Sequence, residues 1–324
     1  MVGSHLADYL LENTSWKIYG LVRWNDKMDN IEHLMSAINN KDNIELLYGD
    51  INDLSSLLSC FNRAAPDYVF HLAAQSYPKT SFDSPLETLE TNILGTAKVL
   101  DAIKKLNLDP IIHVCASSEV FGRVPEEFLP IHEDVPFHPA SPYAISKVGT
   151  DLIGRFYAEA YNMKVMTTRM FTHTGPRRGD VFAESTFAKQ IAMIEEGLIP
   201  PIIKVGNLDS LRTWADVRDA VRAYHLLVTK NPQPGAYYNI GGTHTCTVKE
   251  MLSFLLKCAK VKNIKIEVDP ERLRPIDADL QVPDTTKFNV HTGWMPEISF
   301  EKTMKDLLNY WRKQVKSNKK FLIR

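Results

Sequence analysis

The chain has 324 residues, of which 44% are hydrophobic and 24% are charged, and its formal net charge is −1. A protein of this size and composition buries a substantial core, so we expect one large or two moderate globular domains and not a disordered chain. A charge so close to zero gives no electrostatic reason to expect nucleic acid or an anionic membrane as a partner. Any phosphate binding must therefore depend on local groups of cations.

The cysteines and the hydropathy pattern bear on the cellular compartment. The four cysteines, at positions 60, 115, 246 and 258, have neither the spacing of metal ligands nor the density of a disulfide scaffold. We therefore expect reduced thiols and no metal site. No apolar run approaches the ~20 residues that a membrane helix requires, and the first residues lack the pattern of a signal peptide. These features predict a soluble, cytoplasmic protein.

Residues 1–11 have the pattern of the inside of a βα unit and not of its beginning. An amphipathic run starts almost at once, with Gly3 just inside it. We therefore expect the first strand of the sheet to be missing from this chain.

Apolar and β-branched runs at regular intervals predict the strands that follow. These runs are residues 16–22, 44–51, 67–75, 110–116, 164–171 and 236–242. Helical patterns lie between them, including a long amphipathic one over residues 85–106, and this alternation is typical of an α/β fold with a doubly wound parallel sheet of the Rossmann type. His71 lies inside one of the apolar runs, so we interpret it as a core histidine.

A polar segment follows directly after the predicted strand 110–116. It consists of Ser117, Ser118 and Glu119. In open α/β sheets the carboxyl ends of the strands are where ligands bind. The position of these three side chains therefore favours a functional role.

A tyrosine and a lysine lie one helical turn apart further along the chain. Tyr143 and Lys147 follow Ser141 and Pro142, which suit the N-cap and the first turn of a helix. Residues four apart share a helix face, so we expect the Lys147 ammonium beside the Tyr143 phenol. A cation there would lower the tyrosine pKa from ~10 and make the phenol a general base at neutral pH. The same spacing is also common on exposed helices, but the preceding strand and polar segment favour catalysis.

This pattern resembles the extended short-chain dehydrogenase/reductase family, in which Ser/Thr-x-Glu is followed by Tyr-x-x-x-Lys. Within that family it is most like the sugar-nucleotide 4,6-dehydratases of the GDP-mannose 4,6-dehydratase type. Other segments in the order of that group are residues 175–179 and 206–209, with Arg212, Trp214 and Arg274-Pro275. GDP-4-keto-6-deoxymannose reductases share most of these segments.

The resemblance implies a division of the chain into two parts. A dinucleotide-binding domain is expected over residues 1–171 with about 207–242, and a smaller nucleotide-sugar substrate domain over about 172–206 with 243–324. No repeat or low-complexity linker separates these segments, so we expect the two domains to be interwoven.

The resemblance also implies a nicotinamide cofactor and the residues that hold it. Gly3 takes the position of the last glycine of the family's Gly-x-x-Gly-x-x-Gly loop, and Arg23 stands where NAD-preferring enzymes usually have an acidic residue, so NADP is expected over NAD. The expected cofactor-binding residues are Gly3, Arg23, Asp50, Ile51, Ala73, Ala74, Gln75, Asn92, Tyr143, Lys147, His173 and Arg178. Solvated side chains remain the alternative interpretation for Arg23, Asp50 and Asn92.

A GDP-sugar is the substrate that the resemblance implies. Lys189, Arg212 and Arg274 are the cations expected on its diphosphate, because arginine in particular offers donors matched to phosphate oxygens. Thr172 stands where the family carries Asn in a Phe-Asn-His motif. The substrate contact that the family's Asn side chain makes is therefore in question for this chain. The alternatives are solvated surface charge for the three cations, and a cofactor phosphate or a neighbouring subunit as the target of residues 177–178. The family also implies a homodimer or a homotetramer.

Three hypotheses for function follow. The first is a GDP-mannose 4,6-dehydratase with catalytic NADP, a lyase in which Ser117, Ser118, Glu119, Tyr143 and Lys147 carry the chemistry. The second is a GDP-4-keto-6-deoxymannose reductase, or a dehydratase or epimerase for another nucleotide-sugar such as GDP-heptose. The third, from a different class, is an inactive nucleotide-sugar-binding fragment, motivated by the absent first strand.

Overall fold

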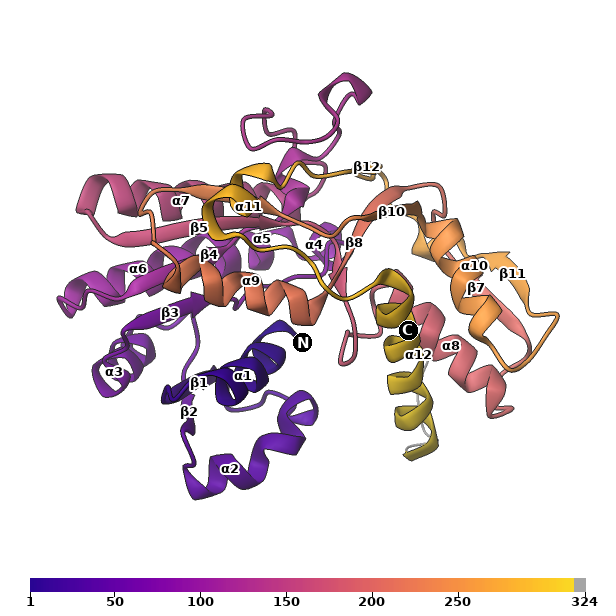
Figure 1. The fold of residues 1–324 in the computed structure, drawn as a ribbon, viewed down its shortest axis with the longest axis horizontal. Helices are drawn as coiled ribbons and strands as arrows, with labels where there is room; N and C mark the ends of the chain where they lie inside the picture. Colours follow the sequence, from indigo (N-terminus) through magenta and orange to yellow (C-terminus); the bar gives the residue numbers. More distant parts are fainter. Residues whose placement is uncertain (318–324) are drawn as a thin grey trace.

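The computed structural model describes residues 1–317, and residues 318–324 of the predicted substrate domain lie outside that range (Figure 1). A four-stranded parallel sheet forms its centre, in the order β3-β4-β5-β9. Its strands are β3 (Tyr68–His71), β4 (Ile111–Cys115), β5 (Lys164–Met170) and β9 (Tyr237–Ile240). The predicted α/β class with a doubly wound parallel sheet is confirmed.

The parallel strands nearest the N-terminus form a separate pair. β1 (Ile18–Val22) pairs with β2 (Ile44–Tyr48), and no ladder joins β1 to β3 within residues 1–317. The first element of the chain is helix α1 (Val2–Asn13). Trp16 stacks on Tyr68 with ring centroids 4.4 Å apart, which ties the start of β1 to the start of β3. The parallel sheet is therefore in two parts.

Helices cover both faces of the central sheet because its strands alternate their side chains. Ile112, Val114 and Val165 pack against α3 (Leu54–Ala64), α6 (Gly95–Lys105) and α7 (Pro142–Tyr161). Met166 and Met170 point to the opposite face, toward α9 (Val217–Thr229) and α11 (Thr286–Thr292). Helix α7 lies very close to the sheet, since a Cβ at Gly154 would be 2.9 Å from the Thr167 hydroxyl.

The predicted helix over residues 85–106 is interrupted. It consists of α5 (Pro85–Leu89), the π-helical segment η2 (Glu90–Leu94) and α6. The short elements elsewhere are η1 (Asp29–Leu34), α2 (Met35–Asn40), α4 (Thr80–Asp83), η3 (Ser118–Phe121), η4 (Glu126–Phe128) and η5 (Pro270–Arg272).

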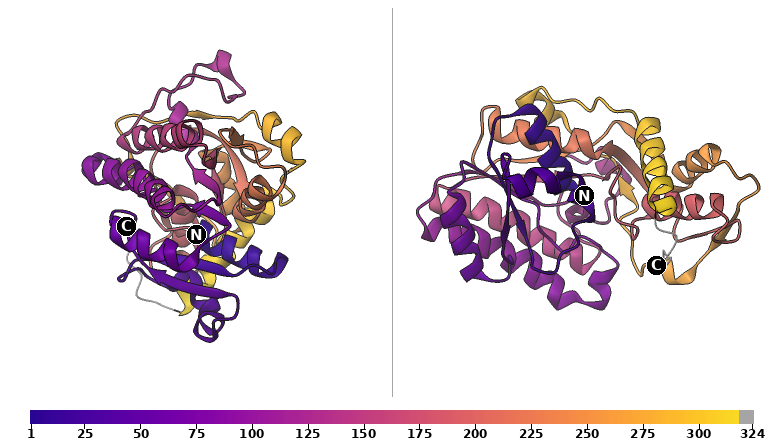
Figure 2. Two further views of the ribbon diagram at one scale, coloured as in Figure 1. Left: turned by 90° about the vertical axis from the view of Figure 1, so that its left-hand side faces the viewer. Right: turned by 90° about the horizontal axis from the view of Figure 1, so that it is seen from below.

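A second group of elements lies to one side of the central sheet and is called the C-terminal lobe here (Figures 1 and 2). Its core is apolar and its members are α8 (Ala183–Glu195), β7 (Ile202–Val205), α10 (Val248–Cys258), β11 (Lys265–Val268) and α12 (Phe300–Ser317). A small sheet lies between this lobe and the central sheet, built on β8 (Leu211–Asp216) with β6 (His173–Thr174), β10 (His244–Thr247) and β12 (Leu280–Gln281). Across residues 1–317, none of the helices has the length and apolar character to cross a membrane.

Candidate active site

The polar segment after β4 turns sharply at the carboxyl end of the central sheet. The Ser117 hydroxyl accepts a hydrogen bond from the Glu119 backbone N–H at 3.2 Å and so caps η3. This cap explains why a hydroxyl residue stands directly after the strand. Ser118 is 5% exposed and the Glu119 side chain 17% exposed, so the segment is largely enclosed.

Helix α7 brings Tyr143 and Lys147 to the same strand end. It begins as predicted, with the Ser141 hydroxyl accepting from the Ala144 N–H at 3.0 Å. Both Tyr143 and Lys147 are buried. The Lys147 ammonium donates to the Cys115 carbonyl at 2.8 Å, which anchors the helix to the last residue of β4.

The expected effect of Lys147 on the Tyr143 pKa is wrong. Burial of the phenol raises the pKa of Tyr143 well above its ordinary value, and the hydrogen bond from Ser117 and the charge of Arg178 only partly oppose this. The Lys147 ammonium is directed to the Cys115 carbonyl, and burial lowers the pKa of Lys147 itself. In this structure Tyr143 is therefore a neutral phenol that Ser117 orients.

Glu119 faces an arginine from the small sheet. Arg212 of β8 places a guanidinium nitrogen 3.9 Å from a Glu119 carboxylate oxygen, and the Arg212 side chain is only 12% exposed. Burial lowers the pKa of Arg212, and the charge of Glu119 partly restores it. The Glu119 charge also acts on Tyr143. A carboxylate and a phenol, both able to transfer protons, thus lie within electrostatic reach of each other.

A second arginine approaches the same site from the turn after β6. The Arg178 guanidinium lies 3.4 Å from the centre of the Phe182 ring and donates to Glu184 at 3.0 Å. Its charge acts on both Tyr143 and His173. Burial is the main cause that lowers the pKa of His173 to about 4, and the charge of Arg178 is the second. This imidazole is therefore neutral at pH 7.

The three predicted substrate cations have different surroundings. Arg274 pairs with Asp277 at 3.3 Å and, like Glu119, acts electrostatically on Arg212. Lys189 is 4% exposed and pairs with Asp180 at 2.9 Å. The structure therefore brings Arg212 to Glu119, with Arg274 within electrostatic reach of Arg212, whereas the Lys189 ammonium on α8 is enclosed. The backbone carbonyl of Thr172 accepts from the Ala215 N–H at 2.9 Å.

Asn92 holds two parts of the site together. It is 2% exposed, and its side-chain amide bonds the Gln75 N–H at 2.8 Å, the Gln75 carbonyl at 2.9 Å and the Ser146 hydroxyl at 2.8 Å. It therefore fixes the loop after β3, which includes Ala73 and Ala74, against α7. The interpretation of Asn92 as a solvent-facing side chain is wrong.

The remaining predicted cofactor residues lie around β1, β2 and α1. The exposed Arg23 pairs with Asp26 at 2.8 Å. The Asp50 carboxylate accepts from the Asn52 N–H at 2.9 Å. Ile51 is buried against Gly95, while Gly3 is exposed with no atom within 4 Å of the position of an added Cβ.

A sequence model of the family described as GDP-mannose 4,6 dehydratase matches residues 1–307. The chain belongs to the GDP-mannose 4,6-dehydratase family. It is 30% identical to a GDP-mannose 4,6 dehydratase of Drosophila melanogaster over 330 residues, which cover 94% of this chain and 82% of the relative. It is also 33% identical to a GDP-6-deoxy-D-mannose reductase of Pseudomonas aeruginosa over 251 residues, or 78% of this chain and 82% of the relative.

A solved structure supports the same assignment. The structure of RMD from Pseudomonas aeruginosa complexed with NADPH matches with a TM-score of 0.79 and 29% identity, covering 92% of this chain and all of that one. Membership of the GDP-mannose 4,6-dehydratase family makes this chain an enzyme, and the predicted resemblance is confirmed.

The family implies a nicotinamide dinucleotide, and the residues of this family member fit one. Gly3 in the first turn of helix α1 leaves open space in which the backbone can approach a phosphate group. An ammonium has three donors, so Lys147 can bond further oxygens beside the Cys115 carbonyl.

Some residues of the site were not found from the sequence. Tyr224 of α9 is buried with its hydroxyl 3.6 Å from the sulfur of Cys115, the residue whose carbonyl anchors Lys147. Nothing in the local pattern of α9 distinguishes Tyr224 from a core aromatic. Asp277 could have been found, since it lies three residues after Arg274.

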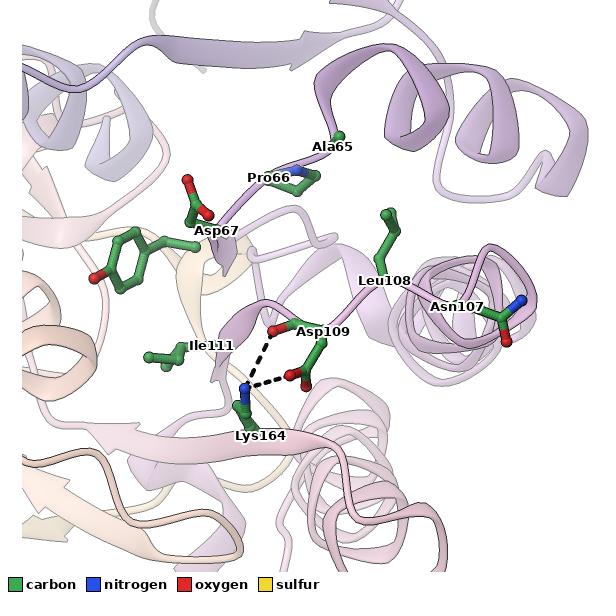
Figure 3. A pocket seen from close by; sticks show the side chains of 9 residues that line it. Ala65, Pro66, Asp67, Asn107, Leu108, Asp109, Ile111 and Lys164 are labelled. Atoms are coloured by element: carbon green, nitrogen blue, oxygen red, sulfur yellow. Dashed lines mark hydrogen bonds and ion pairs between the residues drawn. The ribbon is translucent and has the colours of Figure 1, made fainter.

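A pocket of this protein lies away from the candidate active site (Figure 3). Its volume is about 480 Å³, and Asp67, Tyr68, Asp109, Ile111 and Lys164 are among its lining residues. Tyr68, Ile111 and Lys164 begin β3, β4 and β5, so the pocket lies at the amino ends of strands whose carboxyl ends form the site. Lys164 bridges it by pairing with Asp109.

Proposed function

We propose that this protein is a GDP-mannose 4,6-dehydratase that forms GDP-4-keto-6-deoxymannose with bound NADP. The observation that carries the proposal is the second proton-transfer group: Glu119 lies beside Arg212 and within electrostatic reach of Tyr143. Oxidation or reduction at a single carbon needs only one acid/base, whereas loss of water between two carbons needs a base for the C–H bond as well.

Tyr143 first releases its phenolic proton to solvent, and the phenolate then takes the proton of the C4 hydroxyl as the hydride leaves C4. Burial raises the pKa of Tyr143 and so disfavours the phenolate in the free protein. The hydrogen bond from Ser117 and the charge of Arg178 act in the opposite direction and favour the phenolate. Lys147, at the start of the same helix as Tyr143, has its ammonium anchored to the Cys115 carbonyl, and it would hold the cofactor ribose. The hydride chemistry would be supplied by bound NADP, which would take up the hydride of C4 and give it back at C6.

Glu119 carries the elimination. The ketone formed at C4 acidifies the hydrogen on C5, and the Glu119 carboxylate removes it. The C6 hydroxyl then leaves as water with a proton returned by Glu119, assisted by the Ser118 hydroxyl. A guanidinium nitrogen of Arg212 lies 3.9 Å from the Glu119 carboxylate and holds it in place for this step.

The GDP moiety is bound by the cations of the small sheet and its neighbouring loop. Arg212 and Arg274 bind the diphosphate in this proposal, and Asp277, paired with Arg274, orients its guanidinium. Lys189 is paired with Asp180. It can therefore contact a phosphate only if the phosphate displaces Asp180. A cytoplasmic location and a dimeric or tetrameric assembly stay predictions.

A reductase of GDP-4-keto-6-deoxymannose is the second candidate, and the 33% identity to the Pseudomonas aeruginosa reductase favours it. Incubation of the protein with GDP-mannose and a trace of NADP separates the two. A dehydratase gives a product lighter by one water, with no net change in reduced cofactor. The proposal fails if GDP-mannose is unchanged and the protein instead oxidises NADPH in step with a GDP-4-ketosugar.

A further inference from the structure

A glutamine paired with Arg212 in the small sheet is buried, and no residue among 1–317 forms a hydrogen bond with its side-chain amide. Gln281 of β12 is 1% exposed. Within residues 1–317, neither its side-chain oxygen nor its nitrogen has a hydrogen-bond partner. An amide enclosed in this way costs free energy unless something else completes its hydrogen bonds.

The register of the small sheet places Gln281 beside Arg212. In the parallel ladder between β12 and β8, Gln281 is the partner of Arg212. Paired residues of a ladder direct their side chains to the same face. The Gln281 side chain therefore lies on the same face of the small sheet as Arg212, whose guanidinium is 3.9 Å from Glu119.

The loop around Gln281 is held firmly. The Val282 carbonyl accepts from the Ile131 N–H at 2.8 Å, and the Ile131 carbonyl accepts from the Asp284 N–H at 2.8 Å. Pro283 packs on Gly241, where an added Cβ would be 2.7 Å from the proline ring. The backbone at Gln281 therefore has little freedom to turn the amide toward solvent.

We infer that Gln281 is a specificity-determining residue that hydrogen-bonds the unreactive hydroxyls of the substrate sugar, at C2 and C3 of the hexose. This inference rests on the proposed function. The reaction changes C4, C5 and C6, so the hydroxyls at C2 and C3 are the groups left for recognition. A neutral amide suits them because it offers both donors and acceptors to adjacent hydroxyls.

A binding cycle tests the inference. Parent and Gln281→Leu are titrated, with NADP present, with GDP-mannose and with its 2-deoxy and 3-deoxy analogues. We expect the parent to bind at least one deoxy analogue at least tenfold more weakly than GDP-mannose, because the buried amide is then left unpaired. Gln281→Leu should bind GDP-mannose at least tenfold more weakly and lose that discrimination. If Gln281→Leu discriminates among the three ligands as the parent does, the inference is overturned.

Thermal unfolding without substrate provides a second readout, with Gln190→Leu as the matched control. Gln190 is also 1% exposed, but its amide bonds the Lys204 carbonyl at 3.1 Å and the Lys204 N–H at 2.9 Å. Gln190→Leu should lower the melting temperature, whereas Gln281→Leu should leave it unchanged or raise it. A fall for Gln281→Leu as large as that for Gln190→Leu would show that the Gln281 amide serves folding, and would overturn the inference.

The two proposals fail in distinguishable ways. If the parent binds GDP-mannose but releases no water from it, the proposed function fails while the binding cycle still decides the role of Gln281. If the parent turns GDP-mannose over and Gln281→Leu binds and discriminates normally, only the inference fails.

Discussion

Replacing Glu119 by Gln removes the charge of the proposed C5 base and keeps its size. The Glu119 carboxylate lies 3.9 Å from the Arg212 guanidinium, and the two side chains are 17% and 12% exposed. At an effective dielectric constant of about 20, a pair at that distance attracts by about 4 kcal/mol. The charges of Asp277 and Asp279 remain near Arg212, so we expect the free energy of unfolding to fall by a smaller amount, about 1–3 kcal/mol.

The effect of Glu119→Gln on the reaction should be larger and confined to one step. Loss of a general base costs about 10²–10⁴ in rate, or about 3–5 kcal/mol of barrier. In a single turnover with GDP-mannose, the ultraviolet absorbance of reduced nicotinamide should still appear, while product mass shows no loss of water. The exposed Glu127 provides a control, because Glu127→Gln should change neither stability nor rate. Release of water by Glu119→Gln at the parent rate would refute the reasoning.

Three further predictions concern other parts of the structure. Tyr143→Phe should abolish the first oxidation, so that no reduced nicotinamide appears in the same single-turnover assay; accumulation at the parent rate would exclude Tyr143 as the first base. In the parent, the Arg169 guanidinium is 1% exposed and lies 2.8 Å from the Asp151 carboxylate. Asp151→Asn leaves this buried cation without its counter-charge, so it should lower the free energy of unfolding by about 3–5 kcal/mol in urea titrations. Burial lowers the pKa values of His71 and His113 to about 3 each, so both are neutral in the fold but bind protons in the unfolded chain below ~6.5. Stability should therefore be full above that pH and fall as the pH drops toward 3, by up to about 1.4 kcal/mol per pH unit for each histidine, and stability that rises on acidification would contradict the assignment.

The parts of the fold that depend on local signals could be predicted from the sequence. The start of α7 was predicted from Ser141 and Pro142, and the observed cap at Ser141 confirms it. The polar segment Ser117–Glu119 was predicted at a strand end because β4 is a short apolar run. Such features are decided by neighbouring residues, so a single sequence contains them.

Features that depend on distant residues could not be predicted. The π-helical segment that interrupts residues 85–106 contains Asn92, whose amide bonds reach Gln75 and Ser146. The pKa of Tyr143 rises because the folded chain encloses the phenol, which outweighs any cation on the same helix. In each case the deciding contact joins segments that are far apart in the chain.

The position of Gln281 beside Arg212 has the same origin. β12 is only two residues long, and its register with β8 is fixed by backbone hydrogen bonds that no local pattern reveals. A glutamine in such a segment is most simply interpreted from sequence as a solvated side chain. Only its burial in the folded chain shows that its amide needs a partner.

The central claim is that one active site oxidises C4 and reduces C6 of the same sugar. GDP-mannose carrying deuterium at C4 tests it most directly, with the position of the label in the product read by nuclear magnetic resonance. Our account predicts that the label moves to C6 of a GDP-4-keto-6-deoxyhexose and that unlabelled NADP is recovered. Label that leaves the sugar in reduced cofactor, or a substrate that keeps its label at C4 without loss of water, would contradict it.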